Sequence, residues 1–91
     1  MPKLSVVVCT YNRVEYLITA LKHLKNQVDI ETDAYEVIVV NNNSPDDTDQ
    51  QVKDFLAINN INHWVYVVET NQGHTYARNR GIEESQGELI S

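Results

Sequence analysis

Polar residues that can bind a ligand follow three short apolar runs of this sequence. A tyrosine ring can stack on a nucleobase, side-chain amides can pair with the edge of a heterocycle, and a guanidinium can bind phosphate oxygens. A base, a sugar and phosphates in a row form a nucleotide, so these residue types predict a nucleotide site. The candidate residues are Thr10, Tyr11, Asn12, Arg13, Asn41, Asn42, Asn43 and Arg78.

Each candidate also has a simpler interpretation, which the residues alone leave open. Tyr11 can cap the core at a strand end, and Arg13 can be a solvated arginine of a first helical turn. The asparagines 41–43 can form an ordinary turn, because asparagine tolerates the left-handed conformation and binds its own backbone. The aspartates within 46–49 suggest a metal site, yet carboxylates at a helix start stabilise the helix dipole, and capping is the preferred interpretation. We therefore predict no metal ligand in this chain.

Three buried strands are expected to position these residues. The segments Leu4–Thr10, Tyr35–Asn41 and Trp64–Thr70 are short, rich in valine and almost continuously apolar, which is typical of parallel strands covered by helices on both faces. Helical patterns separate them, and residues 88–91 begin a fourth strand. This alternation predicts an α/β fold with three layers, α/β/α, around a mainly parallel sheet. We expect the first strand to be central, the second and third to lie on one side, and the fourth to lie on the other.

Ligands of open α/β sheets bind beyond the carboxyl ends of the strands. The polar segments that follow the three strands should therefore converge at one edge of the sheet. The first strand would keep a nearly unpaired edge, which predicts homo-oligomers formed through that edge.

Helix boundaries follow from apolar periodicity and from capping residues. Ser44 is the expected N-cap of the second helix, with Pro45 in its first turn. The third helix should begin near His74 or Thr75 and end before Gly87. The apolar stripes expected on the first two helices consist of Leu17, Ala20, Leu21 and Leu24, and of Val52, Phe55 and Leu56.

Size and charge limit the possible classes of protein. The 91 residues suffice for one small domain, 1–91, and the formal net charge is −6. That charge argues against nucleic acid as a partner, because phosphate backbones attract lysine and arginine. No apolar run reaches the roughly 18–20 residues that span a bilayer, and the N-terminus lacks a signal-peptide pattern. The single Cys9 excludes an internal disulfide. We expect a cytoplasmic protein, or one peripheral to the cytoplasmic face of the membrane.

The sequence lacks two common nucleotide-binding loops. The turn after the first strand contains no G-x-G-x-x-G, and no G-x-x-x-x-G-K-[ST] occurs. Instead, the segments Ser5–Arg13, Tyr35–Ser44 and Asn71–Ile82 resemble the family 2 glycosyltransferases, which have a GT-A fold. The resemblance implies that a sugar is transferred from a nucleotide-diphosphate donor to an acceptor hydroxyl, with inversion at the anomeric carbon.

The resemblance also implies roles for single residues. Thr10 and Tyr11 match positions that embrace the base, and Asn42 matches the position that reads the base edge. Asn41 stands where the family usually has Asp, and Arg78 matches the block beside the donor diphosphate. The implied donor is a UDP-sugar, with guanosine and thymidine donors as alternatives, and the acceptor is a sugar, a lipid or a protein.

In the resembling family, an Asp-x-Asp motif after the fourth strand holds a divalent metal, Mg²⁺ or Mn²⁺, and a carboxylate acts as general base. Both positions would lie beyond Ser91, so we expect this chain to be a donor-nucleotide-binding fragment, truncated before the motif and inactive alone. Two alternatives stay open at this point. One is a non-catalytic α/β module that binds a nucleotide or a protein, and the other is a flavodoxin-like receiver or cofactor domain.

Overall fold

The computed structural model describes residues 4–28, 35–62, 64–85 and 88–90. Strands and helices alternate along the chain, as the sequence predicts. The elements are β1 (Leu4–Thr10), α1 (Val14–Val28), β2 (Tyr35–Asn41), α2 (Thr48–Ile58), β3 (Val65–Val68), α3 (His74–Glu84) and β4 (Glu88–Ile90).

The four strands form one parallel sheet in the order β3-β2-β1-β4, which confirms the predicted arrangement. β1 pairs with β2 along its whole length, from Leu4 opposite Tyr35 to Thr10 opposite Asn41. β4 pairs only with residues 4–6 of β1, so within the described residues the other edge of β1 has no partner strand from Val7 to Thr10. Oligomers formed through this edge stay a prediction.

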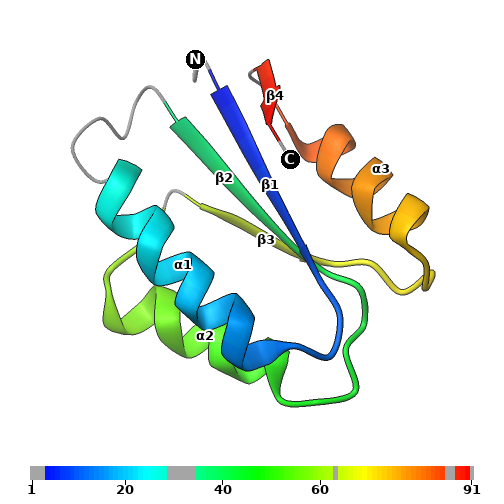
Figure 1. Ribbon diagram of the computed structural model, residues 1–91, viewed down its shortest axis with the longest axis horizontal. Coiled ribbons are helices and arrows are strands. Elements are labelled where there is room, and N and C mark those ends of the chain that lie inside the picture. Colours follow the sequence, from blue (N-terminus) through cyan, green and yellow to red (C-terminus); the bar gives the residue numbers. More distant parts are fainter. Residues whose placement is uncertain (1–3, 29–34, 63, 86–87, 91) are drawn as a thin grey trace.

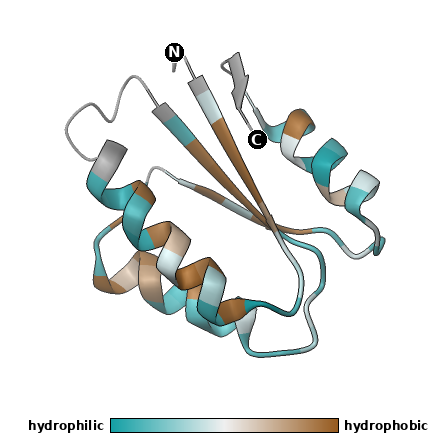
Figure 2. Ribbon diagram, viewed as in Figure 1, coloured by the Kyte–Doolittle hydropathy of each residue, from teal (hydrophilic) through white to brown (hydrophobic). Residues whose placement is uncertain are grey.

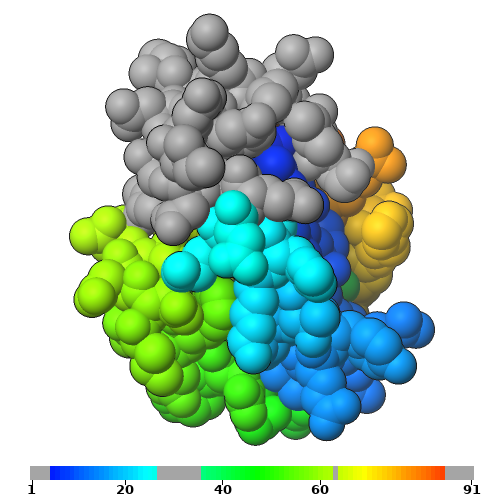
Figure 3. Space-filling model, turned by 60° about the vertical axis from the view of Figure 1, so that its left-hand side comes forward, coloured from blue at the N-terminus to red at the C-terminus, as the bar shows by residue number. Residues whose placement is uncertain are grey.

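Helices cover both faces of the sheet (Figure 1). α1 and α2 lie on one face and contact each other, while α3 packs on β1 and β2 from the opposite face. Figure 3 shows α1 and α2 side by side on the outer surface of the molecule. The architecture is therefore the expected three-layer α/β/α arrangement.

β2 is the centre of the core because its successive side chains enter two different clusters. Val37 and Val39 face α1 and α2, whereas Ile38 and Val40 face α3 with Ala77. The apolar colouring of Figure 2 concentrates in the strands and on the inner sides of α1 and α2. The buried members of the first cluster are Leu17, Leu21, Val37, Val39, Val52, Phe55 and Trp64.

Two details of the expected packing are wrong. The third strand spans only Val65–Val68 and is half-buried throughout, because it lies at the sheet edge and pairs with β2 alone. Ala20 is exposed, so the buried stripe of α1 consists of Leu17 and Leu21, with Leu24 packed against the cluster.

The expected start of α2 is also wrong. The helix begins at Thr48 with Asp47 at its N-cap position, and no side chain binds the free N–H groups from that position. Ser44 is used elsewhere, because its N–H donates to Asn41 Oδ1 and its hydroxyl oxygen accepts the Asn12 N–H. Asp46 Oδ1 instead accepts the Thr48 N–H at 3.1 Å, which orders the turn into α2.

Candidate functional site

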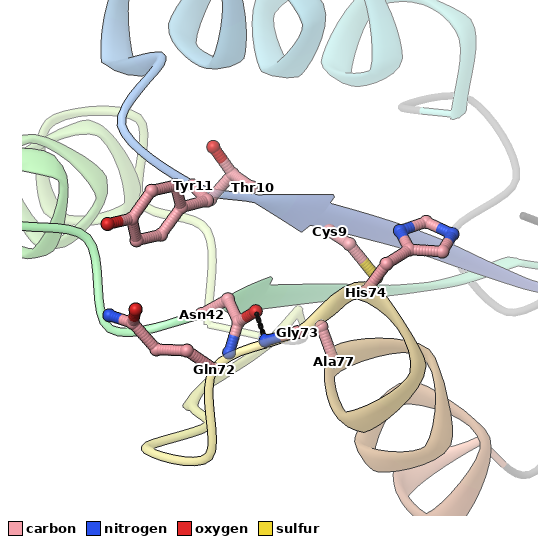
Figure 4. A pocket seen from close by; sticks show the side chains of 8 residues that line it. All are labelled: Cys9, Thr10, Tyr11, Asn42, Gln72, Gly73, His74 and Ala77. Atoms are coloured by element: carbon pink, nitrogen blue, oxygen red, sulfur yellow. Dashed lines mark hydrogen bonds between the residues drawn. The ribbon is translucent and has the colours of Figure 1, made fainter.

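A pocket of about 300 Å³ lies where the carboxyl ends of β1 and β2 meet the start of α3 (Figure 4). Residues from all three of the loops singled out in the sequence contribute to it or border it. This convergence follows from the parallel sheet, which brings successive strand ends to one edge. The lining residues are Cys9, Thr10, Tyr11, Asn42, Gln72, Gly73, His74 and Ala77.

Tyr11 supplies an aromatic ring at the mouth of the pocket. The residue is 46% exposed, so part of its ring is accessible at the surface. Figure 4 places the ring across the opening from Gln72 and Asn42. The next residue, Asn12, has a φ of 54°, and its N–H donates to the Ser44 hydroxyl oxygen at 2.9 Å. Asn12 therefore fixes the turn behind the ring and is not among the lining residues.

Asn42 joins the end of β2 to the loop that enters α3. Its Nδ2 group donates to the carbonyl oxygens of Glu69 and Asn71 at 3.1 and 2.9 Å. Its Oδ1 accepts the Gly73 N–H at 2.9 Å, the bond drawn in Figure 4. Both amide hydrogens are then engaged, and Oδ1 makes one of the two hydrogen bonds that an amide oxygen can accept. Asn42 both builds the pocket wall and retains one acceptor.

Gly73 has a φ of 139°, a conformation that only glycine adopts without strain. This conformation points the Gly73 N–H at Asn42 Oδ1 and leads directly into His74, the first residue of α3. The sequence signal for this part of the pocket is the Gln72-Gly73 pair before a helix, and sequence reasoning did not assign Gln72 or Gly73 to the site.

Asn41 and Asn43 lie outside the pocket lining. Asn41 is 2% exposed, and its side chain is bound between Tyr66 and Ser44. Asn43 has a φ of 58° and an exposed side chain, and its carbonyl oxygen accepts a hydrogen bond from Gln72 Nε2 at 3.2 Å. The three consecutive asparagines therefore have different surroundings, and only Asn42 reaches the pocket.

The two candidate arginines lie on different sides of β1. Arg13 borders a second hollow of about 530 Å³ on the α1 side, together with Tyr16. Arg78 is exposed on α3 beside Ala77. Burial raises the pKa of the Cys9 thiol, and the positive charge of Arg78 offsets part of that rise. Arg78 follows Ala77, which lines the pocket, but is not itself among the lining residues. The two hollows share Cys9, Thr10 and Tyr11; of the two arginines, Arg13 lines the second hollow and Arg78 lines neither.

The described residues do not fit a divalent metal. Among them, no group of three or more His, Cys, Asp or Glu side chains is arranged to hold an ion. Asp47 and Asp49 have Asp-x-Asp spacing, but they lie in the start of α2 outside the pocket. Asp47 accepts a bond from Gln51, and Asp49 binds Tyr66 and Lys53. Both carboxylates thus have side-chain partners, although Asp47 makes no side-chain capping bond from the N-cap position of α2.

Residues 5–91 match the family described as glycosyl transferase family 2. The chain belongs to this family. A curated relative from Campylobacter jejuni, the GalNAc(5)-diNAcBac-PP-undecaprenol β-1,3-glucosyltransferase, is 33% identical over 91 residues, which are 100% of this chain and 28% of that protein. The chain thus spans less than a third of this family 2 relative.

Two solved glycosyltransferase structures superpose on nearly the whole chain. One is the mannosyltransferase PcManGT of Pyrobaculum calidifontis in complex with GDP-Man and Mn²⁺, with a TM-score of 0.85 and 28% identity over 97% of this chain and 26% of that one. The other is residues 1–349 of TarS from S. aureus, with a TM-score of 0.79 and 29% identity over 97% of this chain and 26% of that one. The α/β fold is therefore that of the GT-A glycosyltransferases. Within the part of this family 2 chain that the structure describes, no helix is long and apolar enough to cross a membrane.

Proposed function

We propose that this chain binds the nucleotide of a nucleotide-diphosphate sugar, as the donor half of a glycosyltransferase that transfers the sugar to an acceptor hydroxyl with inversion. The observation that carries the proposal is the pocket between β1, β2 and α3, which combines the partly exposed ring of Tyr11 with the side-chain amide of Asn42. Membership of glycosyl transferase family 2 supports the same assignment.

The base would be held by Tyr11 and Asn42. Stacking on an aromatic ring is worth about 1–3 kcal/mol for each base. The free lone pair of Asn42 Oδ1 requires a donor on the base, and the ring N–H of uracil, thymine or guanine supplies one. Adenine and cytosine carry no hydrogen on the corresponding ring nitrogen and can donate only from their exocyclic amino groups, which lie at a different position on the base edge. We therefore propose a UDP-sugar as donor, with GDP- and dTDP-sugars next in order, and the GDP-Man in the PcManGT structure is consistent with this group.

The phosphates would lie toward the arginines. Arg78 stands on the first turns of α3, directly after Ala77 of the pocket lining, and Arg13 follows β1 on the other side. Thr10, 8% exposed, lines both hollows. Guanidinium groups bind phosphate oxygens in a bidentate manner, which suits a diphosphate that leaves the base pocket along the strand end.

The chemistry of transfer needs groups that this pocket does not supply. Among the described residues, no Asp or Glu lines the pocket, so no carboxylate there can act as general base for an acceptor hydroxyl. The described residues also offer no ligand set for Mg²⁺ or Mn²⁺. We therefore propose that the 91-residue chain binds donor nucleotide but does not transfer sugar alone, whether the acceptor is a sugar, a lipid or a protein.

Calorimetric titration of the chain with UDP, GDP, dTDP, ADP and CDP tests the proposal. We expect binding of the first three and none, or at least tenfold weaker binding, of ADP and CDP, because only the first three carry the ring N–H. Equal affinity for all five would show that Asn42 does not read the base edge. No binding of any of them to a folded chain would overturn the proposal.

A further inference from the structure

Hydrogen bonds connect the first turn of α2 to the loop that follows β1. Tyr66 Oη donates to Asp49 Oδ1 at 2.7 Å, and Asn41 Nδ2 donates to Tyr66 Oη at 3.0 Å. The Ser44 N–H donates to Asn41 Oδ1 at 2.9 Å, and the Asn12 N–H donates to Ser44 Oγ at 2.9 Å. We call these five residues the hydrogen-bond chain. It joins residues that are far apart in the sequence and belong to three strands or their loops and to α2.

Every donor in the hydrogen-bond chain points toward the Asp49 carboxylate. The Tyr66 hydroxyl has one hydrogen, which it gives to Asp49, so it can only accept from Asn41. The Asn41 amide meets both needs, because its nitrogen faces Tyr66 and its oxygen faces the Ser44 N–H. Bonds aligned in one direction and ending on a charge strengthen one another.

The amide at position 41 and the carboxylate at position 49 are a matched pair. A carboxylate at position 41 would have no hydrogen to give to Tyr66, and one hydroxyl hydrogen would then face two carboxylates. Asn41 is 2% exposed, so water cannot readily replace the lost bond. The hydrogen-bond chain therefore requires an amide at position 41 when position 49 carries a carboxylate.

The ionisation of its members agrees with this direction. The hydrogen bond from Tyr66 lowers the pKa of Asp49, and the ion pair with Lys53 Nζ, 3.0 Å from Asp49 Oδ2, acts in the same sense. Burial raises the pKa of Tyr66 to about 12, and the bond to Asp49 contributes to the rise. At neutral pH the donor is thus a neutral phenol and the acceptor is a carboxylate.

The other end of the hydrogen-bond chain lies at the pocket. Asn12 has a φ of 54°, in the left-handed region, which asparagine tolerates better than most residues. Its N–H bond to Ser44 holds the loop in this conformation. The preceding residue, Tyr11, carries the ring at the mouth of the pocket. The backbone that aims this ring is therefore fixed through the hydrogen-bond chain.

We propose that Asp49 and Tyr66 are positioning residues for the Tyr11 loop. They act through Asn41 and Ser44, and neither of them lines the pocket. The consequence for nucleotide affinity rests on the proposed function, whereas the ordering of the loop does not.

Reversing the two hydrogen bonds of the Tyr66 hydroxyl, to positions 49 and 41, tests the proposal. Asn41→Asp should raise the rate of hydrogen exchange at the Asn12 amide and the dissociation constant for UDP, each by about tenfold, because a buried hydrogen bond is lost. The double variant N41D/D49N should restore both to within about twofold of the original chain. In the double variant the new amide at position 49 donates to Tyr66 Oη, and the hydroxyl donates to the new carboxylate at position 41.

Matched controls separate this effect from general loss of stability. Asp54→Asn changes another carboxylate of α2, which binds Gln50 outside the hydrogen-bond chain, and should leave the Asn12 amide unchanged. Lys53→Met removes the ion pair but keeps the Asp49 carboxylate, and should also have little effect. The Gly73 amide, held by Asn42, serves as an internal reference in every spectrum. Tyr66→Phe, a conservative change, should behave like Asn41→Asp.

The outcomes distinguish the two proposals. The positioning role is supported if Asn41→Asp and Tyr66→Phe speed hydrogen exchange at the Asn12 amide and weaken UDP binding, and if N41D/D49N restores both. Unchanged Asn12 exchange in Asn41→Asp and Tyr66→Phe, or failure of the double variant to recover in a folded chain, overturns it. If the original chain binds no nucleotide but hydrogen exchange at the Asn12 amide follows the expected pattern, the proposed function is wrong and the proposed ordering of the loop is still supported. Faster Asn12 exchange with unchanged UDP affinity would overturn the link between the loop and the base.

Discussion

Gly81 of α3 lies directly against Val7 of β1. A Cβ atom at position 81 would come within 2.4 Å of Val7 Cγ1, well inside van der Waals contact. Both residues are buried, and α3 covers β1 and β2 at this point. The missing side chain at position 81 thus sets how closely α3 approaches the sheet, and the start of α3 carries one wall of the pocket.

Gly81→Ala should destabilise the chain by about 1–3 kcal/mol, because the added methyl group overpacks a filled core. Helix propensity alone predicts the opposite sign, a gain of about 1 kcal/mol. Urea unfolding followed by far-UV circular dichroism measures the difference. Asn79→Ala, at an exposed position of the same helix, is the control and should be neutral or slightly stabilising. A gain in stability for Gly81→Ala would show that α3 does not pack this closely.

The sequence predicted the elements that have strong periodic or valine-rich patterns. The α/β alternation, the parallel sheet and its strand order all agree with the structure. It failed where tertiary contacts override local signals. Ser44 has the chemistry of an N-cap, but its N–H and hydroxyl oxygen are bound by Asn41 and Asn12. The third strand is apolar, yet it is half-buried because it lies at the edge of the sheet.

The candidate site, too, could be predicted from the sequence only in part. Strand ends in a parallel sheet meet at one edge, so Thr10, Tyr11 and Asn42 could be placed together from the sequence. The different roles of the three neighbouring asparagines could not be distinguished from the sequence, because these roles depend on partners in other elements. Asn41 binds Tyr66, which is 25 positions away, and Asn42 binds the loop that enters α3. No local pattern reveals such pairings.

Asn42→Asp should destabilise the chain by about 1–3 kcal/mol and speed hydrogen exchange at the Gly73 amide. The carboxylate has no hydrogen for the carbonyl oxygens of Glu69 and Asn71, and it would repel them. Thermal unfolding and amide exchange measure the two effects. Asn43→Asp makes the same chemical change at the next position, where the side chain is exposed, and should be close to neutral. Equal effects of the two changes would contradict the proposed role of Asn42 in holding the loop.

Tyr11→Ala should weaken binding of UDP by about tenfold to a hundredfold, since stacking contributes about 1–3 kcal/mol. Tyr11→Phe should leave the affinity within about threefold, because the ring and not the hydroxyl contacts the base. Tyr76→Ala removes another exposed tyrosine, which does not line the pocket, and is the control. Calorimetry gives the dissociation constants. Loss of affinity in Tyr11→Phe equal to that in Tyr11→Ala would point to a hydroxyl contact instead of stacking.

Tyr66 should ionise at a higher pH than an ordinary tyrosine when the folded chain is titrated with base. Burial raises its pKa from 10.0 to about 12, and the Asp49 carboxylate adds to the rise. The folded state therefore keeps a proton that the unfolded state loses, so this contribution to stability is present below about pH 10 and is lost as the pH rises toward 12. Phenolate absorbance in the near ultraviolet follows the titration. Tyr66→Phe should remove the late step, which is the ionisation near pH 12, and its free energy of unfolding should decrease less steeply between pH 10 and 12. Asp49→Asn should bring the late step to lower pH, because the negative charge beside the hydroxyl is gone. An ionisation step near pH 12 that survives in Tyr66→Phe would contradict the assignment of that step to Tyr66.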